Sequence, residues 1–386
     1  MSEFPRSFIH VFGFAMIFIV LGDIYLAVLY PRSGKGWVGI HLSKTIWRVF
    51  RGIAQAPIWQ RRGDRSQREI FLSYCGPTLL VMVVSVWIAL LLVGFACVIW
   101  SELGSEIRAT DGTTPPDFVT ALYYSGCILT TLGLGDLVPQ TPYLRMLTLA
   151  EAMLGFSIFT LTITYLLAVY SALTHRNIFA LSLHHRTLQT GDAAELLARL
   201  GADGDLSNLR SDLTNISGSL LTLLESHHAY PVVHYFRFQE THYALARIGF
   251  LAMETMTLIC SALHPDRYRS LIRSATVIEL GNGGQHFLME LAKTFLPAKQ
   301  MGGMRQAEDL LRGRYYQAIE RLKQESIEVN PDLEAGADLY ISLRRQWEPY
   351  VMTIAQYMAY DWQEIAPAES EFIHYMSQVL YPPRVS

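Results

Sequence analysis

Three long apolar segments limit what this chain can fold into more than any other feature of its sequence. They run from Phe8 to Tyr30, from Pro77 to Trp100 and from Leu144 to Leu173. Each meets the requirement of roughly 20 predominantly apolar residues for a helix that crosses a bilayer. Backbone polar groups at membrane depth must be satisfied internally, which favours helices. We therefore predict an all-α membrane protein.

The first segment has two alternatives to consider. It could be a secretory signal, but only Arg6 precedes it as a cation and no small-x-small cleavage site follows. It also contains Asp23, and ionisable groups at membrane depth are functional candidates by default. Because Asp23 lies near the end of the segment, we favour a carboxylate that reaches interfacial water.

The loops between the segments differ in charge. The first loop carries nine cations and two acids, and the second carries five acids and one cation. The positive-inside rule then places the first loop and the C-terminus in the cytoplasm. Apolar residues such as Trp37 and Trp47 lie among the cations of the first loop. Part of that loop is therefore either a helix at the membrane interface or an ordinary loop.

The stretch ILTTLGLGDLVPQ, from Ile128 to Gln140, concentrates unusual backbone freedom between the second and third segments. Residues 115–117 (PPD) can open a helix before it, since proline suits the first turn and aspartate the positive N-terminal end. About a dozen helical residues would reach halfway into the membrane, where the negative helix end favours a cation. The chain must then return as non-helical backbone that lines a water-filled path or is buried in protein. Gly133 and Gly135 permit angles that turn successive carbonyls to one side.

The sequence YYSGCILTTLGLGDLVP resembles the pore helix and selectivity filter of the potassium channels, whose filter usually reads TVGYGD and whose carbonyls replace an ion's hydration shell. The resemblance places five residues in the ion-conducting filter: Thr131, Leu132, Gly133, Leu134 and Gly135. Thr130 and Asp136 flank them, with Asp136 at the outer mouth. It implies potassium ions as the permeant ligand, and we expect no other metal and no cofactor.

The resemblance covers roughly Thr78 to Leu173 and continues without gaps along the third segment. It places Gly155 at the family's gating hinge, and Phe159 and Ile163 at positions that line its central cavity. Glu151 lies one turn before Gly155, on the stretch that packs behind the filter in similar channels. We expect Glu151 to bond the filter's backing or a neighbouring subunit rather than the permeant ion.

Two residues near the filter depart from the family's pattern. Leu134 replaces a tyrosine whose ring packs against pore-helix aromatics, so Tyr123 and Tyr124 should lose a partner. Leucine here resembles the second pore loop of the two-pore-domain potassium channels, which keeps potassium selectivity as the expectation and a weakly selective cation channel as the alternative. Cys127 stands where some members have a carboxylate behind the filter, which bears on filter stability against slow inactivation.

One pore loop per chain cannot close a ring, so the resemblance implies a homotetramer around one axis in a lipid bilayer. A bacterial inner (plasma) membrane is the expected location. The region after the pore is larger than the pore itself, so the chain could instead be a membrane-tethered signalling or scaffold protein whose pore-like part mainly assembles it. We divide the chain into residues 1–30 (N-terminal transmembrane helix), 31–76 (basic linker), 77–174 (pore domain) and 175–386 (helical cytoplasmic domain).

Long periodic stretches without strand alternation predict helices throughout residues 175–386. One stretch forms either a heptad seam that joins subunits or a core-facing helix, through Leu206, Leu209, Leu213, Ile216, Leu220 and Leu223. Residues 248–263 are short and contain Glu254, which indicates a buried core helix rather than a span. Gly302 and Gly303 suggest a break between helical halves, and Arg321 and Glu325 have a paired spacing.

Several function classes lack their signatures. No strand followed by GxGxxG appears, no arginine-rich helix precedes the pore, and no P-loop, nucleophile elbow or HExxH indicates an enzyme. A net charge of −3 does not suggest a nucleic-acid partner. The four cysteines are too dispersed for a disulfide framework or a zinc site. Six histidines could form a proton or metal sensor, although scattered positions are favoured: His184, His185, His227, His228, His234 and His242.

Overall fold

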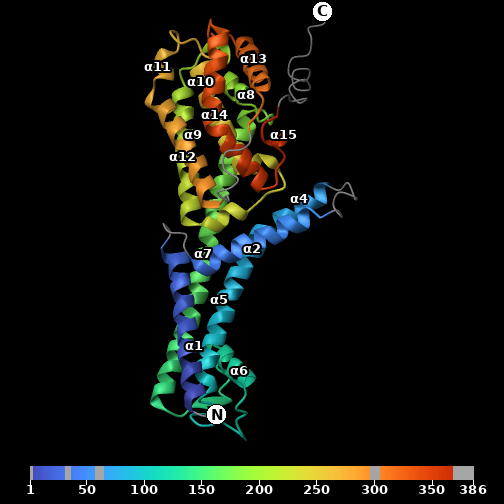
Figure 1. Cartoon of the computed structure of the whole chain (residues 1–386). Helices are drawn as coiled ribbons and strands as arrows, with labels where there is room; N and C mark the ends of the chain where they lie inside the picture. The colour runs from blue at the N-terminus through green and yellow to red at the C-terminus, as the bar shows by residue number, and fades with distance from the viewer. Residues whose placement is uncertain (1–2, 31–35, 57–64, 296–304, 368–386) are drawn as a thin grey trace, which may run out of the picture. The chain divides into compact units, whose positions relative to one another are not determined.

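The computed structural model describes residues 3–30, 36–56, 65–295 and 305–367. The chain divides into two compact units, each assembled from separate stretches of sequence. The first unit comprises Met1–Gly63, Tyr74–Ala172 and His227–Phe236. The second unit comprises Asp64–Ser73, Leu173–Ser226 and Arg237–Ser386. Figure 1 shows the whole chain coloured by position in the sequence.

The first unit is built from long apolar helices. Its elements are α1 (Glu3–Ile24) with a π-helical turn (Tyr25–Leu29), α2 (Trp37–Ala54), α5 (Cys75–Trp100), β1 (Ile107–Ala109), α6 (Phe118–Leu129), β2 (Leu137–Pro139), most of α7 (Pro142–Arg186) and the 3₁₀ helix η3 (Pro231–Tyr235). Among the described residues, three helices are long and apolar enough to span a membrane: Phe8–Leu29, Arg65–Trp100 and Pro142–Arg186. They coincide with the three predicted segments, the first ending one residue short at Leu29, so that prediction is confirmed.

Helices α1 and α5 pack side by side through glycines (Figure 1). A Cβ atom added to Gly13 would lie 2.6 Å from the carbonyl oxygen of Gly94, and one added to Gly94 would lie 2.9 Å from the Ile17 side chain. In a membrane the hydrophobic effect does not drive helices together, so helix association depends on close packing. Small residues allow the two backbones to approach this closely. Helix α1 is thus an integral part of the first unit.

Asp23 does not reach interfacial water, and that expectation is wrong. Its side chain is 4% exposed, and its two carboxylate oxygens accept hydrogen bonds from the backbone N–H of Val38 (2.9 Å) and the indole N–H of Trp87 (2.8 Å). The first bond satisfies a free N–H in the opening turn of α2, and the second reaches α5. Asp23 therefore ties three helices together.

The second unit is a helical bundle around α10. Its elements are α4 (Arg65–Ser73), the end of α7, α8 (Ala193–Leu200), η2 (Ala202–Gly204), α9 (Leu209–Ala229, whose last turn belongs to the first unit), η4 (Thr241–Tyr243), α10 (Leu245–Ser261), α11 (Arg269–Ile272), α12 (Ala275–Phe295), α13 (Glu308–Gln324), α14 (Leu333–Tyr357) and α15 (Trp362–Ile365). Helix α10 packs against α8, α12 and α14. Almost all of its side chains are buried, which confirms the predicted core helix at residues 248–263.

The leucine-rich seam also faces this core. Its six apolar residues are between 0% and 8% exposed within the single chain. A subunit-joining seam would leave them uncovered, so the core-facing interpretation is confirmed and the heptad alternative is wrong. Arg321 and Glu325 form the predicted ion pair at 2.8 Å. Gly302 and Gly303 lie outside the described residues.

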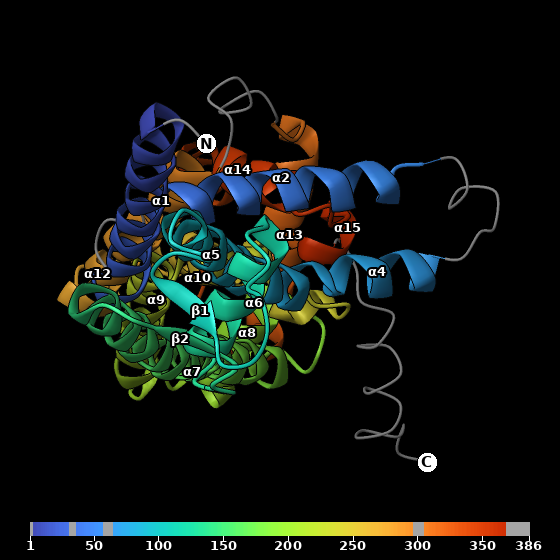
Figure 2. The ribbon, with the colours of Figure 1, turned by 90° about the horizontal axis from the view of Figure 1, so that it is seen from below.

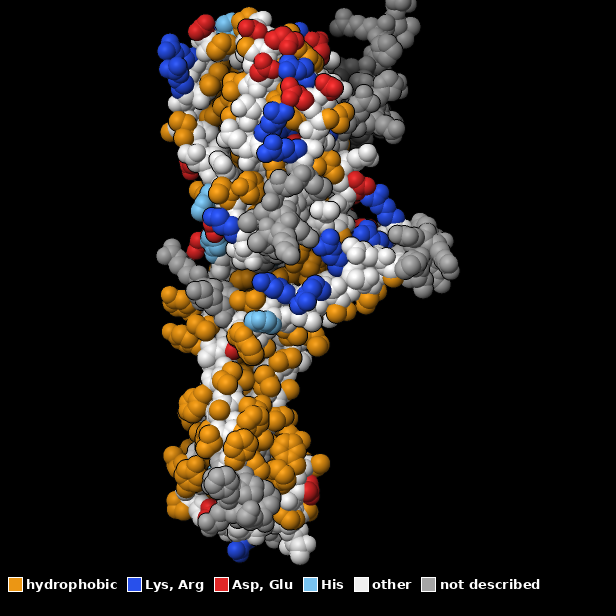
Figure 3. All heavy atoms as spheres, in the orientation of Figure 1, with side chains coloured by type: hydrophobic (Ala, Val, Ile, Leu, Met, Phe, Trp, Pro, Cys, Tyr) orange, Lys and Arg blue, Asp and Glu red, His pale blue; other side chains and the backbone are white. Residues whose placement is uncertain are grey.

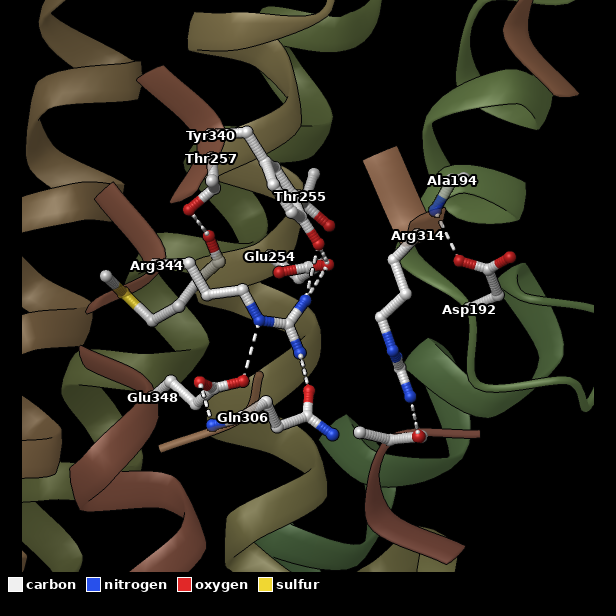
Figure 4. Close-up of polar contacts among 12 residues, drawn as sticks. Asp192, Ala194, Glu254, Thr255, Thr257, Gln306, Arg314, Tyr340, Arg344 and Glu348 are labelled. Atoms are coloured by element: carbon white, nitrogen blue, oxygen red, sulfur yellow. Dashed lines mark hydrogen bonds and ion pairs between the residues drawn. The ribbon is translucent and has the colours of Figure 1, made fainter. Parts of the chain in front are cut away.

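A buried charge cluster joins α10 to α14 (Figure 4). Arg344 is 0% exposed; its guanidinium pairs with Glu254 and, through Nε at 2.8 Å, with Glu348. The hydroxyl of Tyr340 donates to the same Glu254 oxygen. Buried charges persist only when they are paired and hydrogen-bonded in this way, so the cluster fixes how the two helices meet.

Candidate functional site

The site is the non-helical stretch between α6 and α7, and α6 positions its beginning. Asp117 caps the N-terminus of α6, since its side chain accepts a hydrogen bond from the Thr120 N–H at 2.9 Å. The helix ends at Leu129, and the hydroxyl of Thr130 donates to the carbonyl of Gly126 at 2.6 Å. The negative end of the α6 dipole therefore lies directly before Thr131.

The backbone of this stretch alternates in an unusual way. Thr131, Gly133 and Gly135 have φ angles of +59°, +55° and +78°. Left-handed angles are ordinary for glycine but cost a threonine about 1–2 kcal/mol. Strain of this kind is retained where the surrounding structure holds it, often at functional sites. Here every second residue from 131 to 135 has the reversed hand.

Hydrogen bonds to α6 hold the inner half of the stretch. The N–H groups of Leu132 and Gly133 both donate to the carbonyl oxygen of Cys127, at 2.8 and 3.2 Å, and the Thr131 N–H donates to Ile128 at 2.9 Å. These amide groups are therefore turned toward the chain's own helix. The side chains of Leu132 and Leu134 are 61% and 58% exposed in the single chain.

A small sheet, which the sequence did not predict, holds the outer half. Strands β1 and β2 pair antiparallel, and their residues share an apolar cluster with α5 and α6 (Figure 2). The Thr110 N–H donates to the Asp136 carbonyl, and the Thr110 hydroxyl donates to the carbonyl of Gly135, both at 2.8 Å. Thr110 lies in no periodic segment, so no pattern in the sequence pointed to it.

The two tyrosines of α6, which we expected to lose the ring of a tyrosine at position 134, both form hydrogen bonds through their hydroxyl groups. The hydroxyl of Tyr123 donates to the Asp136 carboxylate at 2.8 Å, and the hydroxyl of Tyr124 shares a hydrogen bond with Thr148 of α7 at 2.9 Å. One tyrosine thus braces the stretch itself, and the other braces α6 against α7.

Glu151 of α7 lies behind α6. It is 0% exposed, and its carboxylate accepts a hydrogen bond from the hydroxyl of Ser125, which is equally buried. Glu151 therefore contacts α6, the helix that leads into the stretch 131–135, through Ser125. Ser125 was missed in the sequence, because nothing in the local pattern indicates which hydroxyl of this apolar helix faces Glu151.

Gly155 touches the end of α6. A Cβ atom added there would overlap the carbonyl oxygen of Leu129 and lie 2.8 Å from its carbonyl carbon. Helix α7 runs unbroken through this position. Close backbone packing therefore gives a reason for glycine that is independent of a hinge.

One face of α7 stays uncovered by the chain's own residues. Phe159 and Ile163 follow Gly155 at helical spacing and are 66% and 44% exposed. Other apolar residues exposed along α7 are Tyr143, Met146, Leu149, Met153, Phe156, Leu167 and Tyr170. Hydrophobic side chains dominate the surface of the first unit's long helices (Figure 3).

The basic loop contains a helix, α2, with distinct faces. One face of α2, with Ser43, Trp47 and Ala54, is buried inside the first unit. Lys44 and Arg48 are exposed on another face. Val49 and Ile53 are exposed on a third side at 53% and 46%. The helix is confirmed; its apolar and basic faces are those of an interfacial helix.

Some of the predicted histidine positions come together. In the second unit, the rings of His184 and His242 stack with centroids 4.3 Å apart. Burial lowers the pKa of His242 below its ordinary value of 6.5; the charge of Glu240 opposes this shift, and the charge of Arg247 adds to it. In the first unit, His227 and His234 lie with centroids 6.4 Å apart. No group that could hold a metal ion is found among the described residues.

An outer helix, a half-length helix, a glycine-bearing return strand and an inner helix together define an ion channel domain. Residues 80–172 match the family described as "Ion channel". The chain is also similar to the uncharacterized membrane protein YdjJ of Bacillus subtilis (strain 168), with 27% identity over 250 residues that cover 64% of this chain and 68% of the relative. No solved structure matches the chain.

Proposed function

We propose that four copies of this chain surround one axis and conduct potassium ions along the carbonyl oxygens of residues 131–134. The observation that carries the proposal is the left-handed φ at residues 131, 133 and 135. In a regular strand, successive peptide groups alternate in direction. Reversing the hand at every second residue allows the carbonyls to share one side, as ion coordination requires.

The contacts around the stretch support this direction. Amide groups of residues 131–133 donate to α6, and no backbone hydrogen bond to the carbonyls of these three residues is found in the described part of the chain. The Gly135 carbonyl already accepts a hydrogen bond from Thr110, so we take Gly135 as the outer end of the row. The uncovered apolar face of α7, with Phe159 and Ile163, would line the cavity in a homotetramer.

We place the chain in a bacterial plasma membrane with the second unit in the cytoplasm, because the loop that contains α2 is strongly basic. The second unit would then regulate a gate on α7. The acidic loops around β1 would face outward. The permeant ion is the only ligand that the pore needs, so the proposed activity is transport without chemical change.

Potassium flux into liposomes tests the proposal, with Gly133→Ala as the variant. Alanine at φ +55° is strained by about 1 kcal/mol or more, and it disturbs the middle carbonyls. Gly112→Ala is the matched control, since Gly112 has φ +80° and, like Gly133, has no atom within 4 Å of an added Cβ. We expect flux to be lost in the first variant and kept in the second. Equal loss in both, or no flux in the unaltered protein, would refute the proposal.

Two rival functions make different predictions in the same preparation. A weakly selective cation channel, suggested by Leu134 in place of an aromatic residue, gives a bi-ionic potential near zero between sodium and potassium. If the protein is a scaffold, the Gly133→Ala tetramer stays intact and binds its partners as before, whether or not it conducts ions. Selective conduction requires a reversal potential that follows the potassium gradient.

A further inference from the structure

The segment His227–Phe236 belongs to the first unit, although the chain before and after it belongs to the second. It contains the last turn of α9 and the 3₁₀ helix η3. We refer to it as the bridging segment. Its placement is unexpected, because more than 50 residues separate it from the rest of the first unit.

Aromatic rings attach the bridging segment to the first unit. The ring of Tyr230 lies 6.1 Å from that of Tyr165, and the ring of Phe236 lies 6.3 Å from that of Tyr170. Both partners are on α7, beyond Gly155 in the direction of the second unit. These centroid distances and the edge-on orientations are those of favourable aromatic pairs.

The start of α5 is shaped to receive Phe236. A Cβ atom added to Gly76 would lie 2.6 to 2.8 Å from three atoms of the Phe236 ring. Only glycine leaves room for the ring at this distance. Tyr235, next to it, lies with its ring 6.4 Å from the buried Trp47 of α2. The bridging segment therefore contacts α2, α5 and α7 at once.

The residue that follows is fixed equally firmly within the second unit. Arg237 is 2% exposed, and its guanidinium donates to the carbonyls of Met358 (2.9 Å) and Ala359 (3.2 Å). It pairs with Glu69 of α4 and lies 4.1 Å above the ring of Tyr360. A buried guanidinium with this many partners is a rigid anchor.

We propose that Tyr230 and Phe236 are positioning residues for α7, and that the bridging segment passes the conformation of the second unit to the gate of the pore. One peptide bond joins Phe236, held in the first unit, to Arg237, held in the second. On this proposal, a rearrangement that moves the anchor of Arg237 pulls on Phe236 and, through it, on the ring of Tyr170 on α7. This inference rests on the proposed conduction function.

Single-channel recording tests the coupling with two variants at one contact. Phe236→Ala removes the ring, and Gly76→Ala displaces it without removing any atom from it. An aromatic contact of ordinary strength changes an equilibrium about fivefold. We expect both variants to shift the ratio of open to closed time at least fivefold, in the same direction. Gly52→Ala is the control, because nothing lies within 4 Å of an added Cβ there.

Unit conductance and reversal potential separate positioning from general damage. The altered contacts lie on α5 and α7 and do not include the stretch 131–135, so both quantities should stay unchanged while the open-to-closed ratio shifts. A merely structural role would instead lower the stability of the tetramer, measured by its melting temperature, without changing the open-to-closed ratio selectively.

A variant on the other side of the bond tests whether the signal is transmitted. Glu69→Gln weakens the anchor of Arg237 within the second unit; Glu328→Gln, which removes an acid from an exposed pair with Arg267, is its control. We expect Glu69→Gln to shift the open-to-closed ratio in the direction of Phe236→Ala, with the double variant no stronger than either single one. Additive effects, or a ratio that ignores these variants in a conducting protein, would overturn the coupling. A protein that does not conduct at all refutes the proposed function instead.

Discussion

Replacing Gly155 with alanine places a methyl carbon 2.8 Å from the carbonyl carbon of Leu129 and closer still to its oxygen. Ordinary contact begins near 3.4 Å, and both neighbours are backbone atoms that cannot rotate away. Helix α7 must therefore separate from the end of α6, where the stretch 131–135 begins. We expect the variant to lose stability and to alter conductance together.

The magnitude follows from two opposing effects. Overpacking of this kind costs about 1–3 kcal/mol. Alanine in place of glycine inside a helix gains about 1 kcal/mol. The expected net loss is therefore about 0–2 kcal/mol for Gly155→Ala. Gly22→Ala, in α1 with nothing within 4 Å of the added Cβ, should keep the gain of up to about 1 kcal/mol.

Denaturant unfolding of the purified protein, followed by circular dichroism, measures both variants, and bilayer recording measures conductance. If Gly155 serves only as a hinge, alanine stiffens α7 and the two variants shift stability alike. Equal stabilisation with unchanged conductance would therefore refute the steric reasoning.

Four further results are expected. Asp23→Ala strands two buried donors and should cost about 2–4 kcal/mol of unfolding free energy, measured by denaturant titration. Glu151→Gln should change tetramer melting or the rate at which current decays under sustained activation, because the carboxylate accepts from buried Ser125. Arg344→Met leaves two buried carboxylates unpaired and should cost about 3–5 kcal/mol. Since burial lowers the folded-state pKa of His242, the unfolded chain binds more protons below pH 6.5; stability should fall as the pH drops through that range, and less so in His242→Gln.

Two of these variants, Asp23→Ala and Arg344→Met, have matched controls. Asp111→Ala removes an exposed acid from the loop near β1 and should change stability little. Arg312→Met breaks exposed pairs with Glu334 and Asp338 in the second unit and should cost at most about 1 kcal/mol. If the loss in Arg344→Met is no larger than in Arg312→Met, the buried cluster does not fix α10 against α14. If the melting curve of His242→Gln follows the same pH dependence as the unaltered protein, the titration of His242 is not responsible.

Sequence periodicity and local chemistry predicted the elements that depend on near neighbours. The three apolar segments, the cap at Asp117 and the left-handed glycines at 133 and 135 are set by a few consecutive residues. The core-facing helix at residues 248–263 was predicted for the same reason, since its length and its apolar run are visible in one window.

Contacts between distant residues were not predictable in that way. Asp23 was assigned to water because Val38 and Trp87 could not be placed beside it from sequence. Tyr123 was expected to lose a ring partner, yet its hydroxyl found Asp136 across the folded loop. The contact of Gly155 with Leu129 was not foreseen, because the nearness of Leu129 is a property of helix packing; the hinge assignment stays a prediction. In each case the missing information was which helices approach each other.

The interleaving of the two units has a consequence for biosynthesis. The ribosome completes α7 at Arg186, 50 residues before Phe236 ends the bridging segment, and at ~5–20 residues per second this interval lasts several seconds. During that interval Gly76 and Trp47 lack their partners Phe236 and Tyr235, because the bridging segment has not yet been synthesised. A nascent chain stalled before residue 236 would carry an unfinished membrane part, and so would any fragment that ends at residue 172.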